Sequence, residues 1–468
     1  MNIIQVILLV TIGFGMGFIQ NNQLWKSLLI FISIFLYYWL QPSSSIRNLD
    51  FWLPTLTLLI AFLIYLGWDK FSFQSLRKNL FDFIFVFLPT LLISLTRFLP
   101  YFNITPTPPP VFTSVVIFLL IAITWIILFI RVIPQQLHYS FTFSLLIILF
   151  LFLKIPTLTL WISKAWHYLN HQPVTFSTAL DIKWLGISFI FLRMLHLLID
   201  IRLKRQPIPN FKDYILYLIF FPTLISGPID LFPHFQKEIL VPTQNPINRI
   251  EGFRRVILGA FKKFVLADSL AILALSPQNA PQIKSTLFLW LALLFYSLRI
   301  YFDFSGYTDI AIGIALLLGI RLPENFSAPY LKTNLIQFWN SWHITLANWF
   351  RAYFYYPFMR KFQRQKTLPI PLIILIGQVI TMILIGFWHG ITYNYLLWGI
   401  WHGIGLFINN RWSEWSKKYN YFFSKSPISK SFSWLITFSY VSLGWVWFVL
   451  PDITTSILVY KHLLGIGL

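Results

Sequence analysis

The chain is built from long apolar runs, and these runs decide what it can fold into. A clear example extends from Val111 to Val132 and contains a single charged residue, Arg131. A helix needs about 20 apolar residues to cross roughly 30 Å of bilayer hydrocarbon. The sequence therefore predicts an all-α, polytopic membrane protein with about 11 transmembrane helices and a lipid-facing N-terminal third. Comparable runs occupy residues 3–19, 24–40, 51–66, 80–95, 141–161, 184–199, 258–275, 287–304 and 434–450.

Composition supports a membrane protein and excludes several kinds of chemistry. Only 11% of the residues are charged, whereas soluble globular proteins carry about 25%. We therefore expect one membrane domain over residues 1–468. The chain has no cysteine, which excludes disulfides, thiolate metal ligands and a cysteine nucleophile. No paired carboxylates accompany the histidines that stand out below, so the sequence predicts no metal site.

The charge balance is strongly basic, with 36 Lys and Arg residues against 15 Asp and Glu residues and a net charge of +21. The basic residues lie in short loops between apolar runs, which is the pattern of cytoplasmic loops rather than of a nucleic-acid-binding protein. We expect residues 360–366 and 411–430 to be inside and residues 276–282 to be outside. A basic inner face attracts anionic lipids, an anionic donor molecule or an acidic partner protein.

Three histidines in the C-terminal half, His343, His389 and His402, each follow a tryptophan. His389 lies between two apolar arms, residues 372–387 and 393–407, which we interpret as a hairpin. Each arm has about 15 or 16 residues, or roughly 24 Å of helix, so we expect the apex to lie within the membrane or in a recess. A neutral imidazole at such an apex is a candidate general base. The alternative is a packed structural histidine, the role we assign to His402.

Two further segments do not have the length or pattern of a simple span. Residues 336–356 have a helical stripe of apolar side chains, which predicts an amphipathic helix at the membrane interface with His343 on its buried side. The apolar stretch 214–225 is short and has basic loops on both sides, which indicates a re-entrant segment. Such backbone is tolerated only where it is buried in protein or lines a cavity.

The span at residues 184–199 carries charge along one face. Arg193, His196 and Asp200 recur at helical spacing, so they share a side of the helix. Charged groups at membrane depth face protein or water. This face either lines a substrate path or consists of an arginine that extends to the interface and an aspartate already there.

Several motifs resemble the membrane-bound O-acyltransferase family, in the bacterial branch with the alginate O-acetyltransferase membrane protein and the teichoic-acid D-alanyl transfer protein. The resemblance covers roughly residues 184–468 and leaves residues 1–183 as an N-terminal transmembrane scaffold. The sequence departs from the branch at Trp184–Leu185, Asn340–Ser341 and Ala352. The motifs include SGPI at 226–229, GAFKKFVLAD at 259–268, RLPENFSAPY at 321–330, FWNSWH at 338–343, FWHG at 387–390 and GWVWF at 444–448.

The resemblance implies a reaction and its residues. His389 matches the family's catalytic histidine, and His343 matches a second, more variable functional position. The reaction would move an acyl group, most simply acetyl, from a cytoplasmic thioester donor such as acyl-CoA or an acyl carrier protein to a hydroxyl of an extracytoplasmic polysaccharide or similar cell-envelope acceptor. No permanently bound cofactor is expected, and an extracytoplasmic partner transferase is possible. We expect substrate-binding roles for Asp303, Tyr307, Trp342, Arg351, Trp388 and Asn394.

Two alternatives from other classes stay open at this point. A transporter or flippase would use the histidines to relay protons or line a path. It would be favoured by interrupted spans repeated in two halves, which the sequence does not show. A non-catalytic membrane scaffold for a partner transferase would need no chemistry of its own.

Overall fold

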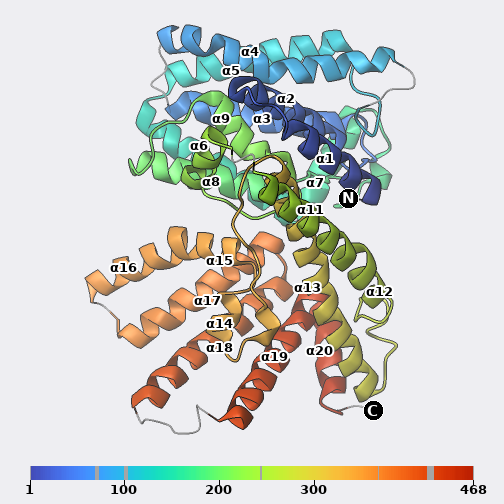
Figure 1. Ribbon diagram of the computed structural model, residues 1–468, viewed down its shortest axis with the longest axis vertical. Helices are drawn as coiled ribbons and strands as arrows, with labels where there is room; N and C mark the ends of the chain where they lie inside the picture. The colour runs from blue at the N-terminus through green and yellow to red at the C-terminus, as the bar shows by residue number, and fades with distance from the viewer. Residues whose placement is uncertain are drawn as a thin grey trace. The chain divides into compact units, whose positions relative to one another are not determined.

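The computed structural model describes residues 2–68, 73–99, 104–242, 245–366, 368–418 and 426–466. In these residues the regular structure is helical, apart from one isolated antiparallel bridge between Phe326 and Trp342. The all-α prediction is therefore confirmed (Figure 1).

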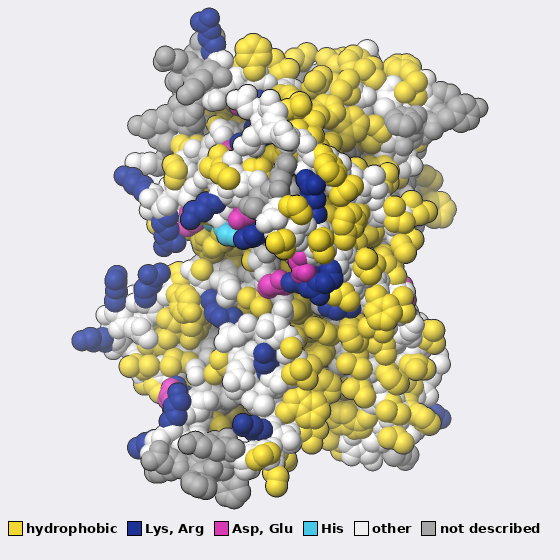
Figure 2. Space-filling model, viewed as in Figure 1, with side chains coloured by type: hydrophobic (Ala, Val, Ile, Leu, Met, Phe, Trp, Pro, Cys, Tyr) yellow, Lys and Arg dark blue, Asp and Glu magenta, His cyan; other side chains and the backbone are white. Residues whose placement is uncertain are grey.

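Seven helices of the described chain are long and apolar enough to cross a membrane, so the protein is a multi-pass membrane protein. Figure 2 shows broad areas of hydrophobic side chains on the visible face, as lipid contact requires. The predicted count of about 11 spans is not confirmed by length and composition. The seven helices are α3 (Leu49–Trp68), α4 (Phe73–Leu95), α5 (Phe112–Val132), α6 (Gln135–Lys154), α13 (Thr286–Leu317), α17 (Ile370–His389) and α19 (Pro427–Val449).

The chain separates into two compact units. The N-terminal unit comprises Met1–Phe253 and Gly313–Leu322, and the C-terminal unit comprises Arg254–Ile312 and Pro323–Leu468. Besides the spans named above, the N-terminal unit contains α1 (Ile3–Met16), α2 (Asn22–Trp39), α7 (Pro156–Leu169), α8 (Ile187–Arg202), α9 (Phe211–Ile219) and α10 (Phe232–Leu240). Helix α2 packs against α4 and α9, and α6 packs against α7 and α8.

One prediction for the N-terminal third is wrong, and another holds for only part of it. The run 141–161 is not one span, because α6 ends at Lys154 and α7 begins at Pro156, where proline cannot continue the helical hydrogen bonding. The lipid-facing prediction agrees with α5 and α6, which are each 17% buried, but not with α3, which is 78% buried. The Thr57 hydroxyl of α3 lies 2.8 Å from the hydroxyl of Tyr37 and accepts a bond from the indole of Trp184.

The charged face of α8 is turned inward onto protein. Arg193 is 2% exposed and donates to the backbone carbonyls of Tyr217 and Leu218 and to the hydroxyl of Thr223, at 3.2, 2.9 and 2.6 Å. These carbonyls lie at the end of α9, which has only 9 residues, or about 14 Å of helix. The prediction that this stretch is too short to cross is confirmed. Arg193 does not extend to the interface, because it holds this short segment.

In the C-terminal unit, α17 and α18 pack along their length, and α18 also packs against α19 (Figure 1). α11 and α13 approach closely at two glycines, since a Cβ on Gly306 would lie 2.7 Å from the carbonyl oxygen of Gly259. Besides the three spans named above, the unit contains the end of α11 (Pro246–Ala260), a π-helical segment (Phe261–Ala267), α12 (Asp268–Ala271), α14 (Leu335–Trp339), α15 (Ile344–Phe350), a second π-helical segment (Arg351–Tyr355), α16 (Tyr356–Gln365), α18 (Tyr393–Lys418) and α20 (Ile453–Leu463).

Two predictions for this unit need correction. The amphipathic helix expected over residues 336–356 is interrupted between α14 and α15, at His343. The hairpin arms are longer than expected, because α17 has 20 residues and α18 has 26. At about 1.5 Å per residue, α17 is long enough to cross the hydrocarbon. Part of the basic stretch 411–430, residues 419–425, lies outside the described residues.

Candidate active site

His343 stands at the break between α14 and α15, with a left-handed backbone (φ +44°). This conformation is uncommon for a residue other than glycine and persists where the surroundings hold it in place. The segment around Asn325 does so here. The backbone N–H of Ile344 donates to the carbonyl of Asn325, and the N–H of Ser327 donates to the carbonyl of Ser341, both at 3.0 Å.

The Asn325 side chain also fixes the orientation and tautomer of His343. Its Oδ1 accepts bonds from the backbone N–H and the hydroxyl of Thr345, at 3.2 and 2.9 Å, and lies 3.2 Å from Nδ1 of His343. Because this oxygen can only accept, Nδ1 of the imidazole must carry the proton. Nε2 of His343 is therefore an acceptor.

The environment keeps His343 neutral. Its side chain is 3% exposed, and burial lowers the pKa of His343 to about 3 because an imidazolium ion would lose its hydration. Nε2 has no hydrogen-bond partner in the described part of the chain. A buried lone pair without a partner is costly in a folded protein, and it leaves Nε2 free to accept a hydrogen bond from a ligand.

His389 is the last residue of α17, at the turn of the predicted hairpin, so the predicted apex position is confirmed. It is partly exposed, and its ring is surrounded by aromatic side chains. The ring centroids of Trp388, Phe448 and Tyr395 lie 4.8, 4.9 and 6.0 Å from that of His389. Gly390 follows with extended backbone and ends the helix.

The two histidines line one cavity of about 40 Å³ within the C-terminal unit. Helices α13, α17, α18 and α19 contribute to its walls, together with the segment from α14 to α15. The indole of Trp445 donates to the hydroxyl of Tyr330, at 3.1 Å, which fixes one wall. The other lining residues are apolar or aromatic, namely Ile300, Phe304, Trp339, Trp342, Leu346, Ala347, Ile385, Trp398, Trp445 and Phe448.

Of the predicted substrate-binding residues, Trp342 lines this cavity. Trp388 packs against both histidines, with its ring centroid 5.9 Å from that of His343 and 4.8 Å from that of His389. His402, to which we assigned a structural role, is fully buried and packs edge-on against Trp339 and Trp398, behind the cavity wall.

Three other predicted site residues are not among those that line the cavity. Arg351 donates to the carbonyl of Trp339 at 3.2 Å, and Tyr307 is buried on α13. The Asn394 amide donates to the carbonyl of Leu450 at 2.8 Å and to the hydroxyl of Ser456 at 2.9 Å. Asn394 thereby ties the start of α18 to the connection between α19 and α20.

Asp303 lies on α13 and belongs to a network of charges. Its carboxylate is paired with Lys263 at 2.6 Å, while Asp309 is paired with Lys262 and Arg255, both at 2.6 Å. Arg255 also pairs with Glu324. The basic side chains of Arg255, Lys262 and Lys263 are therefore balanced by carboxylates of α13 and of the segment that follows α13.

Asn325 is the residue of the candidate site that was not predicted from the sequence. It lies within the RLPENF motif, which drew attention only as part of the resemblance. An asparagine in a loop has many ordinary uses, and its contact with His343 spans 18 residues of sequence. In the described residues, no group of three or more His, Asp or Glu side chains is placed to hold a metal ion.

The comparisons with known proteins agree with this architecture. The model of the membrane-bound O-acyltransferase (MBOAT) family matches residues 136–446, which make up more than half of the chain. The chain belongs to the membrane-bound O-acyltransferase family.

Three curated relatives are similar over part of the chain. A peptidoglycan O-acetyltransferase of Helicobacter pylori is 32% identical over 265 residues, which cover 55% of this chain and 47% of the relative. A probable alginate O-acetylase of Pseudomonas aeruginosa is 33% identical over 289 residues, which cover 60% of this chain and 52% of the relative. A teichoic acid D-alanyltransferase of Bacillus subtilis is 30% identical over 299 residues, which cover 61% of this chain and 74% of the relative. The matches span about half the length of the first two relatives.

Proposed function

We propose that this protein transfers a short acyl group, most simply acetyl, from a thioester donor to a hydroxyl of a cell-envelope polymer. The observation that carries the proposal is the single small cavity lined by both His343 and His389. Family membership supports O-acyl transfer, and the three relatives are named for acetyl or D-alanyl transfer to peptidoglycan, alginate and teichoic acid.

His389 is the proposed general base. Its position at the helix end leaves the imidazole partly exposed, so an acceptor hydroxyl can reach it. The base takes the hydroxyl proton as the oxygen attacks the thioester carbonyl, and the carbon–sulfur bond then breaks. The departing thiolate takes up a proton, so the products are an ester and a free thiol.

His343 is proposed to position the donor. Its Nε2 accepts hydrogen bonds and does not donate them, so it cannot stabilise a developing oxyanion. It suits an amide N–H, which the pantetheine arm of acyl-CoA or of an acyl carrier protein supplies. Asn325 holds the imidazole in the tautomer that this contact needs.

The size of the cavity favours an acetyl group. The cavity has a volume of only about 40 Å³, little more than a few water molecules need, so a short acyl group such as acetyl suits it better than a long one. The buried walls, including Trp398 and Ile385, leave little space for a longer chain.

Purified protein in lipid vesicles tests the proposal with radiolabelled acetyl-CoA and acetyl carrier protein, each with peptidoglycan, alginate and teichoic acid fragments. Wild-type protein should form a labelled ester, and His389→Ala should reduce the rate by about 10²- to 10⁴-fold. His171→Asn, in an exposed loop, is the matched control and should retain full activity. Full transfer by folded His389→Ala protein would refute the proposed base, and absence of product with every pair would favour a scaffold or transporter.

A further inference from the structure

A groove lies between α6 and α8 in the N-terminal unit. None of its lining residues belongs to the histidine cavity. Its volume is about 450 Å³. The walls come from the first turns of α6 and the last turn of α8. The lining residues are Tyr139, Ser140, Phe143, Ser144, Leu198, Ile199, Arg202 and Leu203.

The walls of the groove have a polar part and an apolar part. The Arg202 guanidinium lies over the ring of Tyr139, 5.3 Å from its centroid, and serine hydroxyls line the same stretch of α6. The apolar part includes Phe143 and Leu203, which are 42% and 53% exposed. A ligand that matches both parts carries an anionic group and a hydrocarbon chain.

Arg202 supplies positive charge that the protein does not balance locally. Its neighbour Arg205 is paired with Asp200 at 3.3 Å, and Nδ1 of His196 lies 3.2 Å from the same carboxylate. Within the described ranges, Arg202 has no carboxylate partner of its own. The groove therefore keeps one exposed guanidinium for a ligand.

The groove lies at the basic end of α8, which is followed by Lys204, Arg205 and Lys212. A concentration of Lys and Arg residues marks the cytoplasmic side of a membrane protein, and the cytoplasmic leaflet is the one that carries anionic lipids. Helix α6 is a candidate span that is only 17% buried in the protein. Its outer surface is therefore covered by lipid.

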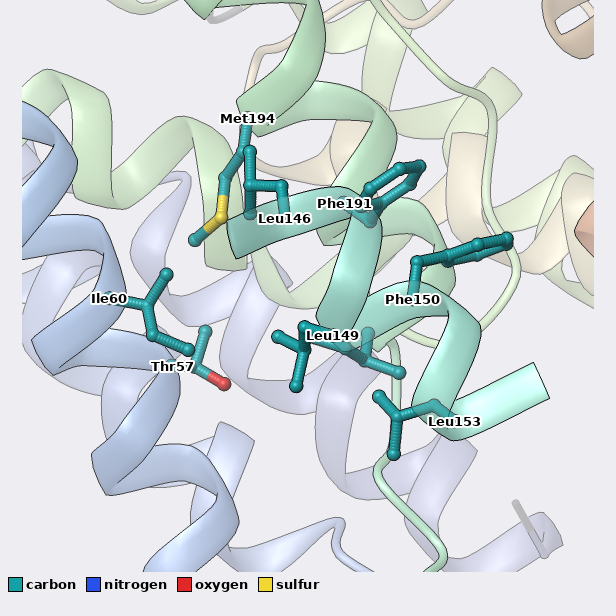
Figure 3. A pocket seen from close by; sticks show the side chains of 9 residues that line it. Thr57, Ile60, Leu146, Leu149, Phe150, Leu153, Phe191 and Met194 are labelled. Atoms are coloured by element: carbon teal, nitrogen blue, oxygen red, sulfur yellow. The ribbon is translucent and has the colours of Figure 1, made fainter. Parts of the chain in front are cut away.

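Farther along α6 and α8, side chains of the two helices pack closely and leave no groove. Figure 3 shows Leu146, Leu149, Phe150 and Leu153 of α6 near Phe191 and Met194 of α8. Phe150 and Phe191 stack with ring centroids 4.4 Å apart, and the cavity there has a volume of only about 10 Å³. A hydrocarbon chain in the groove therefore stays on the outer surface of the helix pair.

We propose that the groove binds an anionic glycerophospholipid of the leaflet on the basic side. The phosphate contacts Arg202, with the hydroxyls of Tyr139 and Ser140 as further donors, and one acyl chain lies along Phe143 and Leu203. The lipid holds α6 against α8, which compensates for the small share of α6 that protein covers.

The test uses nanodiscs with equal amounts of phosphatidylglycerol and phosphatidylcholine that have identical acyl chains. After detergent extraction, mass spectrometry measures the ratio of the two lipids that remain with the protein. Wild-type protein should be enriched in phosphatidylglycerol, and Arg202→Gln should reduce that enrichment about fivefold, because the direct ion pair between the guanidinium and the lipid phosphate is lost.

Lys204→Gln is the matched control, because it removes the same charge from the same exposed segment without changing the groove lining. It should retain the enrichment, and Arg202→Lys should retain most of it. Equal lipid ratios in wild-type and Arg202→Gln protein, or an equal loss in Lys204→Gln, would overturn the proposal. Free glycerol phosphate in excess should not displace the lipid, and displacement would refute the contribution of the chain.

Discussion

The Oδ1 atom of Asn325 lies 3.2 Å from Nδ1 of His343 while it also accepts two bonds from Thr345. This contact determines which nitrogen of the imidazole faces the cavity as an acceptor. It also joins two motifs that are separate in the sequence.

Replacing Asn325 tests this relationship directly. Asn325→Leu removes the acceptor for Nδ1 and for Thr345, so both tautomers of His343 become accessible. We expect at least a tenfold rise in the apparent KM for the thioester donor, with a smaller change in kcat, because donor positioning is lost. Steady-state kinetics in vesicles measure both parameters.

Asn325→Asp is the matched variant that keeps the acceptor, because a carboxylate still accepts hydrogen bonds from Nδ1 of His343 and from Thr345. It should restore most of the donor KM. It should also raise the pKa of His343, since an opposite charge beside an imidazole favours protonation, so activity should fall at mildly acidic pH. If Asn325→Leu and Asn325→Asp have equal KM values, the tautomer argument is wrong.

The low pKa of His343 predicts a dependence of stability on pH. Burial lowers that pKa from 6.5 to about 3 in the folded protein. Between these values the unfolded chain binds a proton that the folded chain does not, so the free energy of unfolding decreases as pH falls. The stability is fully present above about pH 6.5 and declines towards pH 3.

His343→Asn removes this contribution and suits the left-handed backbone at this position. In detergent, its Tm should therefore decrease less between pH 7 and pH 4 than the Tm of the wild type. His171→Asn, which changes an exposed histidine with a similar backbone (φ +53°), should follow the wild-type curve. Parallel curves for His343→Asn and the wild type would contradict the burial argument.

The sequence predicted those parts of the site that depend on local pattern. The hairpin turn at His389 was predictable because apolar arms flank a Trp-His-Gly turn, and the burial of His343 followed from the helical stripe. The break at His343 was not, because it depends on hydrogen bonds from residues 325–327. Likewise, the role of Arg193 depends on where the carbonyls of Tyr217 and Leu218 lie in three dimensions.

The ion pairs of Asp303 and Asp309 make the 254–263 segment a poor docking surface for an anionic donor or an acidic carrier protein. The 254–263 segment is rich in basic residues, but Arg255, Lys262 and Lys263 are paired with carboxylates. Helix α16 instead presents exposed basic side chains, and it packs against α17 around Gly377. The exposed cations are Arg360, Lys361 and Arg364.

Neutralising these three residues of α16 with glutamine should raise the donor KM several-fold and flatten its salt dependence, because exposed charges are screened over about 8–10 Å at physiological ionic strength. Arg255→Gln is the contrasting variant. It leaves Asp309 and Glu324 with fewer partners, so it should lower Tm more than it changes donor KM. An unchanged KM and salt dependence in the triple variant would exclude α16 as the docking surface.

The size of the cavity predicts which acyl groups are transferred. Ile385 lines the cavity from α17 and is 3% exposed, so Ile385→Ala should enlarge the space beside His389. The wild type should transfer acetyl at least tenfold better than butyryl, and Ile385→Ala should reduce that ratio to near one.

Ile373→Ala is the matched control, since Ile373 is 1% exposed on the same helix but does not line the cavity. Both changes should cost about 2–5 kcal/mol of stability, so competition assays with mixed acyl donors at low temperature separate selectivity from folding. An unchanged acetyl-to-butyryl ratio in Ile385→Ala, with His389 still active, would show that the acyl group lies elsewhere.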